Sequence, residues 1–220
     1  DKTSYRASVN YRSGNGVLIN TGYNQFNGRV NISNKALKDK LTLDLNMGAT
    51  DRKSKYGFAD AFRYASIYNP TSPVKSSDPA YSKYDGYFQQ LIYDYNNPVS
   101  ICELNKDEGE RRMLDLSLKG TLEIFKGLNV NAFYSVMTNS SMRSKYFDRN
   151  DFWLGMNRNG LALRQEDNSL SRLFESALSY NGKITSRINL SFTGGYSFQD
   201  FTNEGFYAQG GDFLTDDFTY

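Results

Sequence analysis

The side chains that most often perform chemistry in proteins are sparse in this sequence. Histidine is absent, and Cys102 is the single cysteine among 220 residues. Without histidine there can be no Ser-His-Asp or Cys-His arrangement, and the commonest metal ligand is missing. One thiol cannot form a disulfide within the chain. The sequence therefore predicts no catalytic residue, no metal site and no cofactor, and it predicts that the protein is not an enzyme.

Carboxylates are the remaining groups that could bind a metal ion or cleave a substrate. They gather at two places, which are Asp107, Glu108 and Glu110, and Asp212, Asp216 and Asp217. Their oxygen atoms suit Ca²⁺, but solvated loop charge is the commoner role of such groups, and we favour it. Glycoside cleavage needs two carboxylates at a defined separation, and no other residue supports it. An enzyme is therefore the least favoured of three functional hypotheses.

Aromatic side chains in polar stretches are the candidates for ligand binding. They are Trp153, Tyr81, Tyr84, Tyr87 and Phe88. A ring of this kind can stack on a sugar. Loop aromatic residues more often pack against neighbouring loops or a partner protein, and that is the alternative role for these rings.

Composition excludes several classes of protein. Hydrophobic residues make up 39% and the mean hydropathy is −0.63, yet aromatic residues reach 15%. A disordered chain would be poor in aromatic residues. No apolar run approaches the ~18 residues that a membrane-spanning helix requires. A net charge of +2 is too small to recruit nucleic acid, so we expect no nucleic-acid partner.

Alternation of apolar and polar residues with a period of two dominates the chain and predicts β-strands. Seven strands are predicted, at residues 5–11, 26–32, 41–49, 114–124, 128–136, 174–180 and 188–198. The pattern leaves open an eighth strand that begins near Phe206. The stretch 114–124 matches the ~9–11 residues that a tilted strand needs to cross a bilayer, whereas soluble strands more often run to ~5–6.

The two faces of these strands differ in chemistry. One face is predicted to meet lipid through Leu41, Leu43, Leu45, Leu114, Leu116, Leu118, Leu122 and Ile124. The other face is predicted to line a lumen through Arg29, Asp44, Asn46, Asp115, Lys119, Glu123 and Asn131. A narrow barrel could not satisfy this many polar groups in its interior, so the lumen must be wide, hydrated or plugged by polar groups.

The connections alternate in length. Short turns are predicted around residues 38–40, 125–127 and 181–187, and long loops between residues 49 and 114 and between 136 and 174. Tight turns at one rim and long loops at the other are typical of an outer-membrane β-barrel. The alternative is a soluble β-sandwich that binds carbohydrate through loop aromatic residues.

Strand number sets the size of the whole barrel. A plugged lumen goes with about 22 strands, so seven or eight cannot enclose it. We therefore predict an all-β fold, an antiparallel transmembrane β-barrel segment of about seven or eight strands within a larger barrel. Residues 1–220 would all belong to one barrel domain, without its plug, its N-terminal domain or its closing strands.

One helix is predicted in the first long loop. Phe58, Ala61, Phe62, Ala65 and Tyr68 recur at helical spacing, and Asn69-Pro70 ends the helix. The surrounding stretch, residues 56–74, resembles a loop that follows an early barrel strand in the SusC/RagA family of TonB-dependent outer-membrane transporters of Bacteroidetes. The stretches 5–11, 31–43 and 213–220 are similar to other parts of that barrel, in the same order.

The resemblance implies a function that the residues alone do not indicate. Proteins of this family resemble one another in having a plug inside a 22-stranded barrel, a segment that contacts TonB, and a SusD-like surface lipoprotein over the outer mouth. The expected role is import of oligosaccharides or peptides across the bacterial outer membrane, with outer-membrane lipid around the barrel. The segment that contacts the TonB complex would lie outside this chain.

Overall fold

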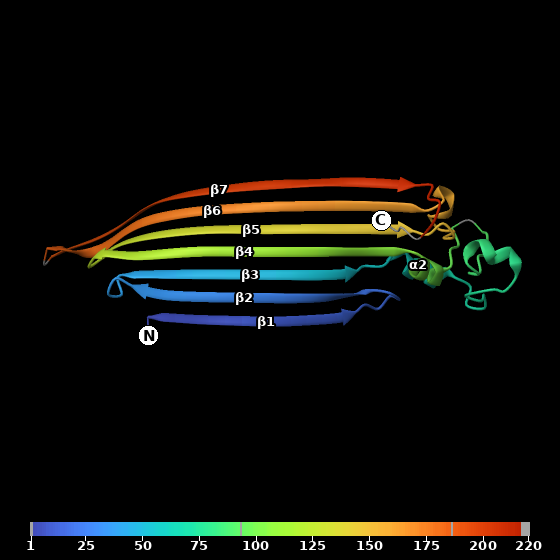
Figure 1. Ribbon diagram of the computed structural model, residues 1–220, viewed down its shortest axis with the longest axis horizontal. Helices are drawn as coiled ribbons and strands as arrows, with labels where there is room; N and C mark the ends of the chain where they lie inside the picture. Colours follow the sequence, from blue (N-terminus) through green and yellow to red (C-terminus); the bar gives the residue numbers. More distant parts are fainter. Residues whose placement is uncertain (1, 93, 186, 217–220) are drawn as a thin grey trace.

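The computed structural model describes residues 2–92, 94–185 and 187–216, and its main feature is one antiparallel sheet of seven strands in sequence order (Figure 1). The strands are β1 (Thr3–Asn15), β2 (Gly22–Ala36), β3 (Leu41–Lys55), β4 (Lys106–Phe125), β5 (Leu128–Phe147), β6 (Leu161–Thr185) and β7 (Ile188–Gly211). The connections contain α1 (Asp60–Ile67), η1 (Pro79–Tyr84), α2 (Pro98–Leu104) and η2 (Met156–Arg158). No helix among these residues is both long and apolar enough to cross a membrane.

The predicted antiparallel, all-β fold is confirmed, with two corrections. Phe206 lies inside β7, which continues to Gly211, so the eighth strand is wrong for the described residues. The β-sandwich alternative is also wrong for this part of the chain, because all seven strands belong to one sheet and each pairs with its neighbour in sequence. β1 and β7 form the two edges of that sheet.

The two ends of the sheet are built differently (Figure 1). Between β2 and β3, three consecutive residues, Leu37, Lys38 and Asp39, take φ values of 52°, 57° and 68°, which closes a tight turn. The turn between β4 and β5 uses Gly127 with a φ of 92°, a conformation that glycine adopts at little cost. The helices and long loops gather at the opposite end, which we call the loop end.

Pairing between strands sorts the side chains into two faces. Leu45 pairs with Leu118, and one residue earlier Asp44 pairs with Lys119. Because successive side chains in a strand point to opposite faces, the seven leucine residues predicted to meet lipid share one face, the apolar face. Ile124 lies at the register shift between Glu123 and Phe125, where the alternation is interrupted, so its contact with lipid stays a prediction. The seven residues predicted to line a lumen share the other, the polar face, where the Asn46 amide donates to Ser117 Oγ over 3.3 Å.

The strands, 13 to 25 residues long, extend well past the apolar stretches. On the apolar face, the rows above Leu114 become charged, and Lys53 approaches Glu110 at 3.2 Å while Lys55 approaches Glu108 at 3.8 Å. Arg112 approaches Asp51 at 3.8 Å. The apolar face therefore has two zones, an apolar band near the turns and a charged ladder toward the loop end.

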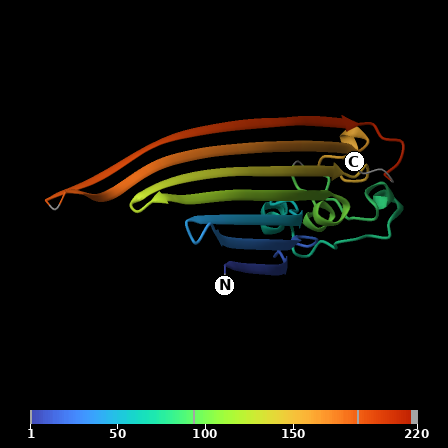
Figure 2. The same cartoon turned by 60° about the vertical axis from the view of Figure 1, so that its left-hand side comes forward.

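The edge of the apolar band crosses the sheet at a slant, and Figure 2 shows the turn ends of the strands stepping outward from β1 to β7. On β7 the band ends at Phe198, whose row of paired residues reaches β2 at Ile32. On β2 the band ends six residues away, at Phe26. With ~3.3 Å per residue and ~4.8 Å per strand, this offset corresponds to a strand tilt of about 40°. Transmembrane barrels tilt their strands by ~35–45°.

The helix α2 was not predicted, although its start has a clear local cause. Asn97 is fully buried, and its Oδ1 accepts hydrogen bonds from the backbone N–H groups of Val99 and Ser100 at 3.0 and 3.3 Å. Pro98 follows at the first helical position, where its missing N–H is not needed. The Asn97 amide also donates to the carbonyl oxygens of Val74 and Phe88 at 2.9 and 3.0 Å. Asn97 thus joins three parts of the first long loop.

We expect Asn97→Ala to weaken this loop strongly. It removes the helix cap and leaves two carbonyl groups without their amide donor, which should lower the free energy of opening residues 74–102 by about 2–4 kcal/mol. Hydrogen exchange of the full-length protein measures this directly. The control is Asn69→Ala in the same loop, where Asn69 is exposed and its side chain accepts hydrogen bonds from Thr71, two residues away. Equal protection in both variants would contradict the assigned role.

Candidate functional site

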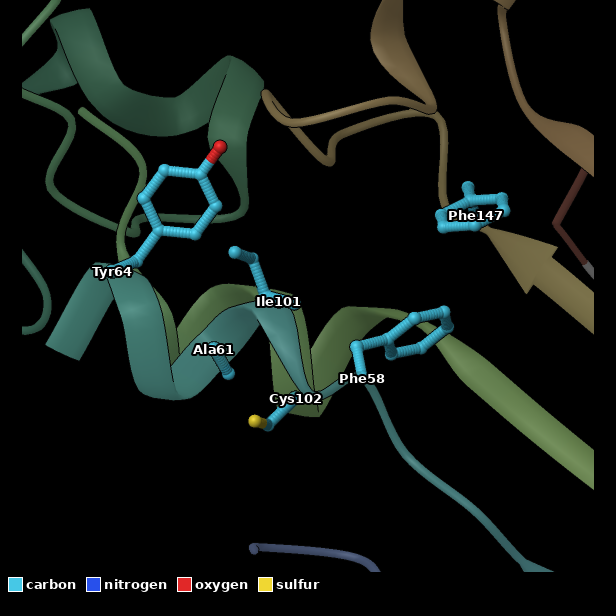
Figure 3. Close-up of a cluster of buried hydrophobic side chains, with 6 residues drawn as sticks. All are labelled: Phe58, Ala61, Tyr64, Ile101, Cys102 and Phe147. Carbon is cyan, nitrogen blue, oxygen red and sulfur yellow. The ribbon is translucent and has the colours of Figure 1, made fainter. Parts of the chain in front are cut away.

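The loop end contains a small hydrophobic core, shown in Figure 3. Its members are Phe58, Ala61, Tyr64, Ile101, Cys102 and Phe147, and we call them the loop core. Ala61 and Tyr64 lie three positions apart on one side of α1, Phe58 comes just before that helix, and Ile101 and Cys102 belong to α2. The loop core therefore fixes the first long loop against the end of β5.

Trp153 joins the second long loop to the loop core. Its ring centroid lies 5.5 Å from that of Phe58 and 5.7 Å from that of Phe147, both in edge-on geometry. A third contact, to Tyr64, spans 6.5 Å. Edge-on pairs of this kind stabilise beyond simple burial. The structure thus places Trp153, a predicted ligand-binding residue, in a packing role, with its ring partly buried.

A buried carboxylate positions Trp153. Asp151 is fully buried and accepts hydrogen bonds from the backbone N–H groups of Trp153, Leu154 and Gly155 at 3.3, 3.0 and 3.4 Å. Burial raises the pKa of Asp151, while the three N–H groups oppose that shift. Gly155 is required here, because a Cβ atom would lie 1.9 Å from the Asp148 carbonyl oxygen. The sequence pattern did not lead us to predict a role for Asp151 or Gly155. The feature that could have indicated it is an acidic residue followed by glycine four positions later.

The other predicted aromatic ligands pack within the loops. Tyr84 and Tyr87 are each 2% exposed, so neither presents a ring face to solvent in this arrangement. Tyr84 meets Phe152 edge-on at 5.4 Å, which connects the two long loops. Tyr81 and Phe88 are partly exposed, and their ring centroids lie 5.0 Å apart. These two rings, with Trp153, keep some surface that a ligand could reach.

Ion pairs neutralise Asp107 and Asp216, two of the carboxylates at the loop end. Asp107, whose side chain is 1% exposed, accepts two hydrogen bonds from Arg143 at 2.7 and 2.6 Å, and Arg143 stacks over the Tyr56 ring at 4.5 Å. This pairing raises the pKa of Arg143. Burial would raise the pKa of Asp216, but hydrogen bonds from Tyr146 and Arg149 outweigh it and hold that pKa below its ordinary value. Asp217 and the rest of 217–220 lie outside the described residues.

The polar face carries two shallow hollows that share Lys119 and Phe133. One, of about 530 Å³, also contains Asp44 and Asn46, and the other, of about 670 Å³, contains Asn131 and Glu175. Arg29 and Asp115 line a third hollow of about 370 Å³ on the same face. Hydrogen-bond donors and acceptors both line these hollows together with the Phe133 ring, a surface that suits hydroxyl and amide groups. Phe133 was not among the predicted residues because it belongs to a polar row.

A two-faced sheet of long, tilted strands, with tight turns at one end and packed loops at the other, defines part of the wall of a transmembrane β-barrel.

No family model matches the sequence. A TonB-dependent receptor, P3 of Formosa agariphila, is 24% identical over the whole chain, which covers 22% of that receptor. The SusC receptor of Bacteroides thetaiotaomicron is 26% identical over 52% of the chain, which is 12% of SusC.

Solved structures agree on the fold. The RagAB peptide transporter matches with a TM-score of 0.70 over 99% of the chain and 25% of the solved chain, at 14% identity. Its open-open state matches with a TM-score of 0.73 over 98% of the chain, at 15% identity. The chain thus has the fold of a barrel segment, and its sequence is similar to TonB-dependent receptors, SusC among them, which supports the resemblance to the SusC/RagA family. It spans about a fifth of the first relative's length.

We expect Gly155→Ala to disturb the second long loop, because the new methyl group would overlap the Asp148 carbonyl. Overpacking of this kind costs about 1–3 kcal/mol, and it should raise hydrogen exchange across residues 148–160 of the full-length protein. Gly28→Ala is the matched control, since a Cβ atom at Gly28 has no neighbour within 4 Å. If Gly155→Ala left exchange unchanged, the close approach would not exist in solution.

Proposed function

We propose that the chain is part of an importer in the bacterial outer membrane. The observation that carries this proposal is the two-faced sheet, with an apolar band of membrane-spanning length on one face and charged and amide groups on the other. The relatives are named as receptors and transporters and none as an enzyme. Residues 1–220 would form a continuous part of one barrel domain, and the rest of the polypeptide would close it.

The polar face is proposed to line the lumen. Arg29, Asp44, Asp115 and Lys119 supply charge of both signs, which suits a plug or a hydrated substrate better than a dry interior. The substrate class is proposed as oligosaccharides or peptides. The solved neighbours are described as a peptide transporter and importer, and this description supports the peptide alternative by likeness of fold.

The loop end is proposed to face the cell exterior, where substrate arrives. The partly exposed rings of Tyr81, Phe88 and Trp153 are the proposed ligand contacts of this chain. A SusD-like surface lipoprotein is the proposed partner, supported by the relative named SusC and the neighbour RagAB. Energy would come from the TonB complex through a segment outside this chain.

The orientation of the two faces can be tested with adjacent residues on opposite faces. Leu118→Arg places a charge in the apolar band and should reduce assembly of the full-length barrel, since a charged residue facing the bilayer midplane costs about 2–4 kcal/mol. Ser117→Arg places the same charge on the polar face and should leave assembly near the wild-type level. The amount of folded protein in outer-membrane fractions measures both. The reverse pattern would overturn the assignment of faces.

The import function can be tested in cells that lack the full-length protein. Uptake of labelled oligosaccharides and peptides should fall on deletion, return on complementation, and fall again when TonB is depleted. A substrate from one of the two classes should show all three effects. Uptake that persists without TonB would contradict energy-coupled transport by this protein.

A further inference from the structure

One hollow of the described residues lies on the apolar face, away from the polar face. It measures about 810 Å³ and sits at the loop end of β1 to β5. Lys53, Lys55, Glu108 and Glu110 line it, and all four belong to the same face as Leu114 and Leu118 by strand pairing. A lumen site would lie on the other side of the sheet. This hollow is therefore separate from the proposed transport route.

The wall of the hollow is held in place by the loop core. The turn between β1 and β2 forms one side, and in it the Gly16 N–H donates to the Thr21 carbonyl oxygen at 2.9 Å. Leu18 of this turn packs against the loop core, and the Asn20 amide donates to the Cys102 carbonyl oxygen at 3.2 Å. A hollow whose wall is already ordered can bind a ligand with little further loss of conformational entropy.

One polar atom in the hollow has no partner within the protein. Ser144 lines the hollow and is 1% exposed, and its Oγ is the single buried side-chain nitrogen or oxygen of residues 2–92, 94–185 and 187–216 that makes no hydrogen bond. A hydroxyl both donates and accepts, and leaving one buried without a partner costs about 1–3 kcal/mol. Ser144 thus marks a position where a ligand hydroxyl would be stabilised.

The charges of the hollow balance. Two lysines face two glutamates, in pairs at 3.2 and 3.8 Å, so their sum is zero. A phosphate group would meet the two glutamates, and a metal ion would meet the two lysines. A neutral ligand with many hydroxyl groups can instead accept from the lysines and donate to the glutamates at once. The Met142 side chain, which also lines the hollow, offers an apolar contact for a sugar ring.

The height of the hollow identifies the source of such a ligand. Glu110 lies four residues beyond Leu114 on β4, which is about 13 Å along the strand at ~3.3 Å per residue and, with a tilt of about 40°, about 10 Å in height. If the apolar band meets lipid, as the proposed function requires, the hollow stands just above the hydrocarbon, beside the head groups of the outer leaflet. We infer that it binds a neutral sugar of the saccharide head group of an outer-leaflet glycolipid.

The test uses the full-length protein purified from outer membranes in detergent. Glycolipid extracted from the same cells is added back, and the bound amount is measured by native mass spectrometry. Ser144→Ala should weaken binding about five- to tenfold, the effect of one lost hydrogen bond. Ser135→Ala is the matched control, because Ser135 lies in the same strand on the polar face. Equal binding by wild type and Ser144→Ala would overturn the inference.

A second arm separates sugar from phosphate. Glycolipid treated with phosphatase should bind as well as the untreated form, and loss of binding on this treatment would overturn the neutral-sugar assignment. The saccharide released from the lipid should compete, whereas the lipid part alone should not. Uptake of transport substrate should be unchanged in Ser144→Ala. A failure of import in wild-type cells would contradict the proposed function and leave the measured binding unaffected.

Discussion

The backbone ladder of the sheet is the constraint on which the rest of the structure depends. Each strand pairs with the next along the chain, without a register shift from β1 to β4 and with single irregularities near the turns of the last two hairpins. Because a slip of one residue would exchange the two faces of a strand, this register keeps Leu118 and Lys119 on opposite sides along with their neighbours in every strand. The two chemical environments of the protein follow from that separation.

Where the alternation is strong, the sequence alone predicted the strands well. Residues 41–49 and 114–124 read as two-faced strands because one face is uniformly apolar there. The sequence pattern did not predict that the same strands continue toward the loop end. There Lys53 and Glu110 occupy the apolar face, so both faces are polar and the alternation is lost. Cross-strand ion pairs, which depend on two distant segments, hold that part of the sheet. The periodicity of one segment does not indicate which other segment it pairs with.

The loop end was predicted less well, for a related reason. The helix at 60–67 was predicted from its spacing. By contrast, α2 has seven residues and depends on Asn97, whose side chain has four hydrogen-bond partners in three separate segments. Trp153 is an isolated aromatic residue in a polar stretch, so its sequence context is the same for a sugar contact and for a buried anchor. Its packing against Phe58 brings together residues far apart in the chain. Only the fold distinguishes the two roles.

The distribution of buried residues reflects the difference between the loop end and the sheet. Every buried hydrophobic residue of the described chain lies between Phe58 and Phe147, and these residues form the packing of the loop end. The sheet has no such core, because one face is built for lipid and the other for polar neighbours. Only the part of one face that meets lipid needs to be apolar, and the charged ladder and the whole polar face lower the mean hydropathy of the chain. A mean hydropathy of −0.63 therefore agrees with a membrane-spanning wall, since each strand changes its surroundings twice without breaking its hydrogen-bonded ladder.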